Sequence, residues 1–147
     1  MDEATLAKYR ADVIRRSINL EWILNVIISQ NYFHTIHGTF IFEVLYDPGF
    51  NLRLKINIVS KMKRINKKMI AHLHEIADVR NVFAHFDPNF IKPTGEEVAP
   101  DPKNLQEQIN FQEKYKKFIE LEGKVLPYLW QFLKDLGVKA ETTKKLK

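Results

Sequence analysis

The sequence predicts an all-α protein, an up-and-down bundle of four to five helices. Apolar residues recur at steps of three and four along most of the chain, which is the spacing of one helix face. Five glycines and six prolines among 147 residues leave long runs free of helix breakers. Apart from a short apolar stretch at residues 40–45, no segment shows strand periodicity. This length fits one domain, which we expect over residues 1–137, followed by a basic, frayed tail at 138–147.

Composition limits the classes of function. The chain has no cysteine, which excludes disulfides, thiolate metal sites and cysteine nucleophiles. No apolar run reaches about 18 residues, so we expect no membrane span. The acidic N-terminus lacks a signal-peptide pattern, and a cytoplasmic protein is the default expectation. The net charge of +5 permits an anionic partner without requiring one. We expect no cofactor.

The first helix is expected over residues 2–32. From Leu20 to Ile28 it is apolar nearly all round, so it should be covered on more than one side, by the rest of the monomer or by a second copy. Glu21 interrupts this stretch. A carboxylate in such surroundings is expected either to pair with an arginine or to lie near a site.

The next stretch, residues 33–50, is predicted to hold a short helix around 40–45, with a turn at Asp47-Pro48-Gly49. His34 and His37 are three residues apart, a spacing that suits one helix face. No carboxylate or third histidine lies close to them in sequence, so we expect no metal site.

Further helices are expected over residues 51–70, with an interruption near Asn66, and over 71–86. Residues 87–103, which carry four prolines, form a connector. The last helix is expected over 104–136, capped by Asn104, kinked or split at Pro127 and followed by a C-cap signal at Gly137.

Residues 71–86 separate into two faces on a helix. An apolar stripe lies opposite a polar stripe of His74, Asp78, Asn81 and His85, and the apolar stripe consists of Leu73, Ile76, Val79, Phe83 and Phe86. Arg80 lies between the stripes and offers a planar fork of donors that suits phosphate. His85 is a side chain suited to acid–base chemistry. The same pattern is also typical of an ordinary solvated helix, and His72 falls on the apolar side, as a core or boundary residue.

A basic window precedes this helix. Between Asn51 and His74 there are seven basic residues and no acidic residue until Glu75. The window predicts either a phosphate-facing surface or a solvated helix balanced by acids elsewhere in the fold. The candidates for nucleic-acid contact are Arg53, Lys61, Lys63, Arg64, Lys67 and Lys68.

The stretch Arg80-Asn81-Val82-Phe83-Ala84-His85 resembles the Arg-Asn-x-x-Ala-His form of the motif of HEPN domains. Residues 76–79 resemble the apolar lead-in to that motif, and residues 48–56 resemble the preceding helix of the mannitol-repressor-like branch. The resemblance implies a four-helix bundle that forms homodimers, often a metal-independent ribonuclease in toxin, defence or RNA-processing systems.

By this resemblance, His85 would be the acid or base, Arg80 would meet the scissile phosphate and Asn81 would orient the site, with possible support from His74, Asp78 and Glu21. The partners implied are a second copy, RNA or a nucleotide, and an antitoxin or regulatory protein. The alternative is a non-catalytic, mannitol-repressor-like transcriptional regulator, or an interaction or nucleotide-binding module, in which Arg80 pairs with an acidic residue.

Overall fold

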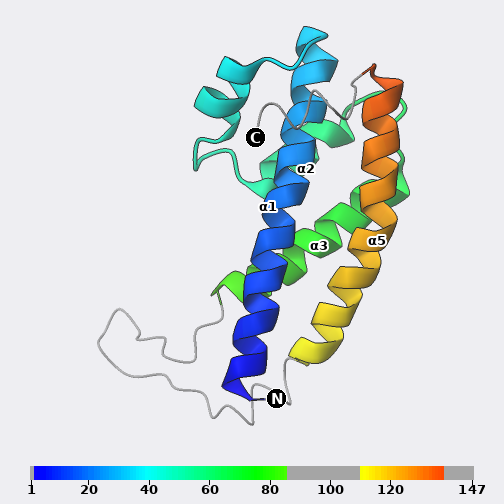
Figure 1. The fold of residues 1–147 in the computed structure, drawn as a ribbon. Helices are drawn as coiled ribbons and strands as arrows, with labels where there is room; N and C mark the ends of the chain where they lie inside the picture. Colours follow the sequence, from blue (N-terminus) through cyan, green and yellow to red (C-terminus); the bar gives the residue numbers. More distant parts are fainter. Residues whose placement is uncertain (1, 86–109, 138–147) are drawn as a thin grey trace.

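The computed structural model describes residues 2–85 and 110–137. This part of the chain contains five helices and no strand, which confirms the all-α prediction (Figure 1). The helices are α1 (Glu3–Phe33), the π-helix η1 (Phe40–Leu45), α2 (Leu52–Ser60), α3 (Lys67–His85) and α5 (Phe111–Asp135).

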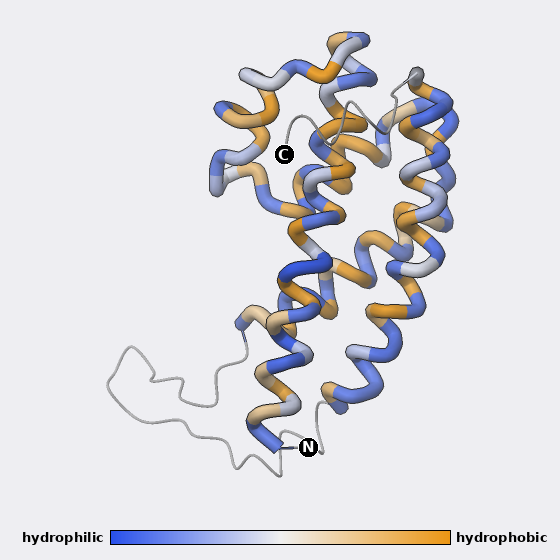
Figure 2. Tube along the Cα trace, in the orientation of Figure 1, coloured by the Kyte–Doolittle hydropathy of each residue, from blue (hydrophilic) through white to orange (hydrophobic). Residues whose placement is uncertain are grey.

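Three long helices form the body of the bundle. Helices α1 and α5 run side by side in the same direction, and α3 runs back obliquely across both of them (Figure 1). The short helices η1 and α2 lie against the half of α1 where that helix ends. Apolar residues gather where the helices face one another (Figure 2). Because α3 has 19 residues and crosses both α1 and α5, its first and last turns lie far apart in the molecule.

The second half of α1 is the centre of the core. Every residue from Trp22 to Ser29 is buried, as the nearly continuous apolar character of this stretch predicts. The cover comes from η1, α2, α3 and α5 of the same chain. Helix α1 begins after Asp2, whose carboxylate accepts a hydrogen bond from the Thr5 N–H at 2.7 Å, and it ends at His34 in the left-handed region with φ of 58°.

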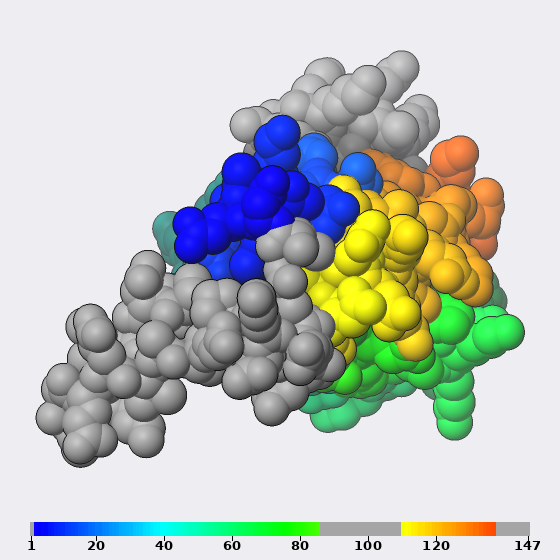
Figure 3. Space-filling model, turned by 90° about the horizontal axis from the view of Figure 1, so that it is seen from below, coloured from blue at the N-terminus to red at the C-terminus, as the bar shows by residue number. Residues whose placement is uncertain are grey.

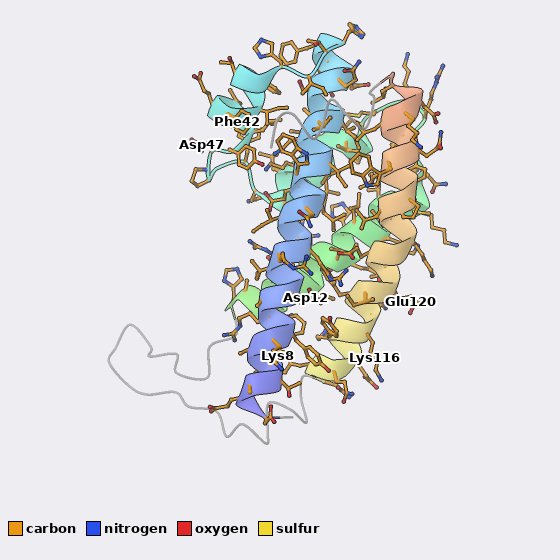
Figure 4. The ribbon with its side chains drawn as sticks, viewed as in Figure 1. Lys8, Asp12, Phe42, Asp47, Lys116 and Glu120 are labelled. Carbon is orange, nitrogen blue, oxygen red and sulfur yellow. The ribbon has the colours of Figure 1, made fainter. Side chains whose placement is uncertain are left out.

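The first half of α1 is joined to α5 by a polar cluster. The Tyr115 hydroxyl donates to the Asp12 carboxylate at 2.6 Å, and Arg16 bridges Asp12 at 2.8 Å and Glu122 at 2.6 Å. The rings of Tyr9 and Tyr115 stack with centroids 4.1 Å apart. Figure 3 shows the first turns of α1 beside those of α5, and Figure 4 shows Asp12 on this part of α1. This cluster fixes the two helices at the end away from η1.

The short helices differ in detail from the sequence prediction. Residues 40–45 form a helix, as expected, and bury Ile41 and Leu45 completely. The expected interruption in the 51–70 helix is confirmed, but it is longer than predicted: α2 ends at Ser60 and α3 begins at Lys67. The Asn66 side chain caps α3 by accepting from the Lys68 N–H at 2.8 Å. The predicted helix 71–86 is thus the later part of a longer helix.

Helix α5 begins after Asn110, whose side chain accepts from the Glu113 N–H at 3.1 Å. The predicted start at Asn104, the connector 87–103 and the tail 138–147 lie outside the described residues. Pro127 does not split the helix, which continues to Asp135. Pro127 and the residue one turn before it, Gly123, are both exposed, so the carbonyl that loses its N–H partner faces water. Gly137, with φ of 90°, donates its N–H to the Lys134 carbonyl at 2.9 Å and ends the helix as predicted.

Among the described residues, none of the helices has the length and apolar character needed to cross a bilayer.

Candidate functional site

Helix α3 places the motif residues by burying its apolar stripe. Leu73, Ile76, Val79 and Phe83 are all buried, as predicted, and Phe86 lies outside the described residues. The last turn is attached to α1, because Arg10 Nε donates to the Phe83 carbonyl at 2.9 Å. This packing fixes the rotation of α3 and therefore the directions in which its polar side chains point.

Arg80 is half-buried and incompletely partnered. Its Nη1 donates to Asn81 Oδ1 at 3.3 Å, while its Nε is buried and has no hydrogen-bond partner among the described residues. No carboxylate of the described residues lies within ion-pairing distance of it. A guanidinium in this state has unused donors for an anion.

Arg80 lines a small pocket with a volume of about 190 Å³. The opposite walls come from α1, from the turn after η1 and from the start of α2, and the polar residues among them are Glu21, Tyr46, Asp47, Asn51 and Lys55. The prediction that Glu21 lies near a site is consistent with this position.

The prediction that Glu21 pairs with an arginine is wrong, because Glu21 forms its ion pair with Lys55. The Lys55 Nζ lies 3.1 Å from the Glu21 carboxylate and 5.6 Å from the centre of the Tyr46 ring, and Lys55 is only 1% exposed. Burial raises the pKa of Tyr46, and the nearby charge of Glu21 raises it further. The Glu21 carboxylate therefore forms its ion pair with Lys55 and not with Arg80.

Asn81 and His85 are exposed and lie one turn apart at the end of α3. Within the described part of the chain, no hydrogen bond or ion pair engages His85. The imidazole of His85 is therefore accessible to a ligand from solvent.

The proposed supporting residues His74 and Asp78 are joined by Arg53. Arg53 Nη2 forms an ion pair with Asp78, and Arg53 Nη1 lies 2.9 Å from His74 Nδ1. The bridge connects α2 to α3 and is partly exposed. Arg53 is thus balanced by an acid from outside the basic window, as the solvated-helix interpretation expects.

The remaining basic residues lie at the other end of α3. Lys61, Lys63 and Arg64 lie in the turn between α2 and α3, and Lys67 and Lys68 begin α3. Eighteen residue steps separate Lys67 from His85, which is roughly 27 Å along a helix at about 1.5 Å per residue. The structure therefore brings Arg80 together with Asn81 and Glu21, and Arg53 together with His74 and Asp78, but it holds the other five cations away from His85.

Sequence reasoning missed four polar residues that line the Arg80 pocket: Tyr46, Asp47, Asn51 and Lys55. One signal for Lys55 was present. It lies three residues after Leu52 and four before Val59, both buried, so helical spacing places it on the buried side of α2. The other three come from a turn whose approach to α3 depends on the fold.

The remaining histidines have local roles. His34 ends α1, and His37 Nδ1 accepts from the Phe40 N–H at 3.1 Å. Both ring nitrogens of His72 are buried, and the residue is half-buried, as its boundary position predicts. The described residues contain no group of three or more side chains placed to hold a metal ion.

The site as described is a half-buried arginine with unused donors, an amide bonded to it and an exposed histidine, all in the last two turns of α3. Comparisons with protein-family models, with curated proteins and with solved structures find no match to this chain.

Proposed function

We propose that this protein is a HEPN-like, metal-independent endoribonuclease that acts as a homodimer, with Arg80, Asn81 and His85 as its catalytic residues. The observation that carries the proposal is the state of Arg80. A half-buried guanidinium whose buried Nε has no partner among the described residues is costly unless an anion completes its hydrogen bonds. The phosphodiester of RNA is an anion of suitable shape.

The chemistry uses the nucleophile that RNA carries. The 2′-hydroxyl attacks the adjacent phosphorus, the bond to the 5′-oxygen breaks, and the products are a 2′,3′-cyclic phosphate and a 5′-hydroxyl. One imidazole removes the 2′-hydroxyl proton, and an acid protonates the leaving 5′-oxygen. His85 supplies the first role, and the His85 of a second copy supplies the other. Arg80 stabilises the charge that develops on the phosphoryl oxygens, and Asn81 holds the guanidinium.

An exposed apolar patch beside Arg80 supports the homodimer. Phe42 and Tyr46 are 51% and 46% exposed, and Tyr46 also lines the Arg80 pocket. The rings of Phe42 and Tyr46 stack with centroids 5.6 Å apart, and Trp22 lies within 6.4 Å of both. Figure 4 shows Phe42 and Asp47 on the segment that projects beside the upper half of α1. A second copy that covers this patch would bring two motifs close together.

A second candidate function is that of a non-catalytic regulator or interaction module. The bridge from Arg53 to Asp78 and His74 favours it, because that bridge uses half of the polar stripe of α3 for contacts within the chain. The two candidates differ in one respect that is simple to measure, which is cleavage of RNA.

The test compares the wild type with Arg80→Ala and His85→Ala on a mixed RNA pool in EDTA, after light scattering has confirmed that each preparation is dimeric. We expect the wild type to cleave and each variant to lose at least about 100-fold in rate, the usual effect of removing an acid–base group or a charge-stabilising donor. Measurement of the initial rate on a gel is sufficient.

His34→Asn is the matched control. It removes another exposed histidine at a helix end, and asparagine tolerates the left-handed backbone at this position. It should cleave at the wild-type rate. Equal rates for His85→Ala and the wild type would overturn the catalytic assignment, and an inactive wild-type dimer would favour the second candidate.

A further inference from the structure

A second cleft lies beside the start of α3, whereas Arg80 and His85 lie in the last two turns of that helix. Its volume is about 610 Å³, and its walls come from the end of α1, the α2–α3 turn and the last turns of α5. Two kinds of side chain dominate the lining: the cations Lys61, Lys63 and Arg64, and the aromatic residues Tyr32, Tyr128 and Phe132.

The three cations are exposed and carry unbalanced charge. None of them forms an ion pair or a side-chain hydrogen bond within the described residues. The adjoining first turn of α3 adds two more lysines and no acid. One carboxylate, Asp135, lines the same cleft, where its Oδ1 accepts from Gln131 Nε2 at 2.9 Å. The balance of charge therefore favours an anion that also offers donors to a carboxylate.

The aromatic wall is held in place. The Tyr128 hydroxyl accepts from the Asn66 N–H at 2.7 Å, which ties α5 to the α2–α3 turn. The rings of Tyr128 and Phe132 lie with centroids 6.2 Å apart. Tyr32, from α1, is 55% exposed and so has a ring face available to a ligand. Ring faces of this kind stack on planar heterocycles.

The turn that carries the cations has an unusual backbone. Arg64 has φ of 76°, a left-handed conformation that L-residues other than asparagine and aspartate rarely adopt. Glycine adopts this conformation without steric cost, so substitution by glycine removes the cation while keeping the backbone.

We infer that this cleft binds a phosphorylated nucleoside. Its phosphate would contact the lysines and Arg64, its base would stack on Tyr32 or Tyr128, and its sugar hydroxyls or exocyclic amines would donate to Asp135. The source of the nucleoside is either a free mononucleotide or one nucleotide of an RNA strand. The inference does not rest on the proposed ribonuclease activity, because none of its residues belongs to the Arg80 site.

The test is calorimetric titration of the full chain with four probes: 5′-AMP, adenosine, inorganic phosphate and a hexa-adenylate RNA. All titrations use the His85→Ala variant, so that the hexa-adenylate RNA is not cleaved during the measurement. We expect 5′-AMP or the hexanucleotide to bind more tightly than adenosine or phosphate alone, because only these combine a ring with a phosphate. Tighter binding of 5′-AMP identifies a free nucleotide as the ligand, and tighter binding of the hexanucleotide identifies an RNA strand.

Two cleft variants and a control complete the experiment. Tyr32→Ala and Arg64→Gly should each weaken binding roughly tenfold, through lost stacking and a lost phosphate contact. Lys116→Ala removes an exposed cation from the far end of the molecule, where Figure 4 labels it, and should change the Kd by less than about twofold.

The inference is overturned if no probe binds, or if Lys116→Ala weakens binding as much as Arg64→Gly does. Its failure is separable from that of the proposed function, because binding is measured in the His85→Ala background, where cleavage plays no part, and cleavage is measured separately on the chain that keeps His85.

Discussion

The basic run between Arg53 and Lys68 divides into two regions with opposite surroundings. In the first, Arg53 pairs with Asp78 and the buried Lys55 pairs with Glu21, so both charges are neutralised within the chain. In the second, Lys61, Lys63 and Arg64 project from a turn and have no such partner among the described residues. A charge run in sequence thus serves two purposes: its helical part joins α2 to its neighbours, and its turn part remains available to a ligand.

The largest expected effect of this difference concerns Lys55. Lys55→Met removes one member of a pair whose lysine is 1% exposed and leaves the Glu21 carboxylate, 24% exposed, without its partner. We expect the free energy of unfolding to fall by about 2 to 3 kcal/mol, less than for a fully buried pair because water reaches Glu21. Urea unfolding measures this change.

Lys61→Met is the matched control in the second region. It removes an exposed lysine that forms no ion pair with any residue the structure describes, so the free energy of unfolding should change by no more than about 0.5 kcal/mol. Similar losses in the two variants would remove the distinction between paired and unpaired cations.

A smaller effect is expected from the polar cluster between α1 and α5, where other cations have acidic partners. Burial would raise the pKa of Asp12, but hydrogen bonds from Tyr115, Arg15 and Arg16 outweigh it and lower the pKa from 3.8 to about 2. A lowered pKa stabilises the folded state above the unfolded value and ceases to do so as the pH falls through the folded value. This contribution is therefore fully present at pH 7 and disappears between about pH 5 and pH 2.

Asp12→Asn tests this linkage. Its free energy of unfolding should be lower than that of the wild type by up to about 2 kcal/mol at pH 7, and the gap should close as the pH falls toward 2. Thermal unfolding at several pH values measures both curves. A gap that stays constant with pH would mean that the ionisation of Asp12 does not stabilise this cluster.

Helical spacing predicts much of the fold. The long α1, the short helix at 40–45, the interruption before Asn66 and the buried side of α3 all follow from the recurrence of apolar residues and from local capping signals. The continuity of α5 through Pro127 does not follow from helical spacing, because it depends on which side of the helix faces water.

Less of the candidate site than of the fold can be predicted from the sequence. Asn81 and His85 are placed on one exposed face by their spacing alone. The pairing of Glu21 with Lys55 joins residues 34 positions apart, and the separation of the turn cations from His85 follows from the direction in which α3 runs. The ion pair and the separation both result from the packing of distant segments, which the local spacing of apolar residues does not predict.

The most direct test of the proposed function uses two oligonucleotides of the same mixed sequence, one of RNA and one with every 2′-hydroxyl replaced by hydrogen, incubated with the wild-type protein in EDTA. We predict that only the RNA is cleaved and that its fragments end in a 2′,3′-cyclic phosphate and a 5′-hydroxyl. Cleavage of both strands, or of neither, would contradict a mechanism in which the 2′-hydroxyl attacks a phosphate held by Arg80.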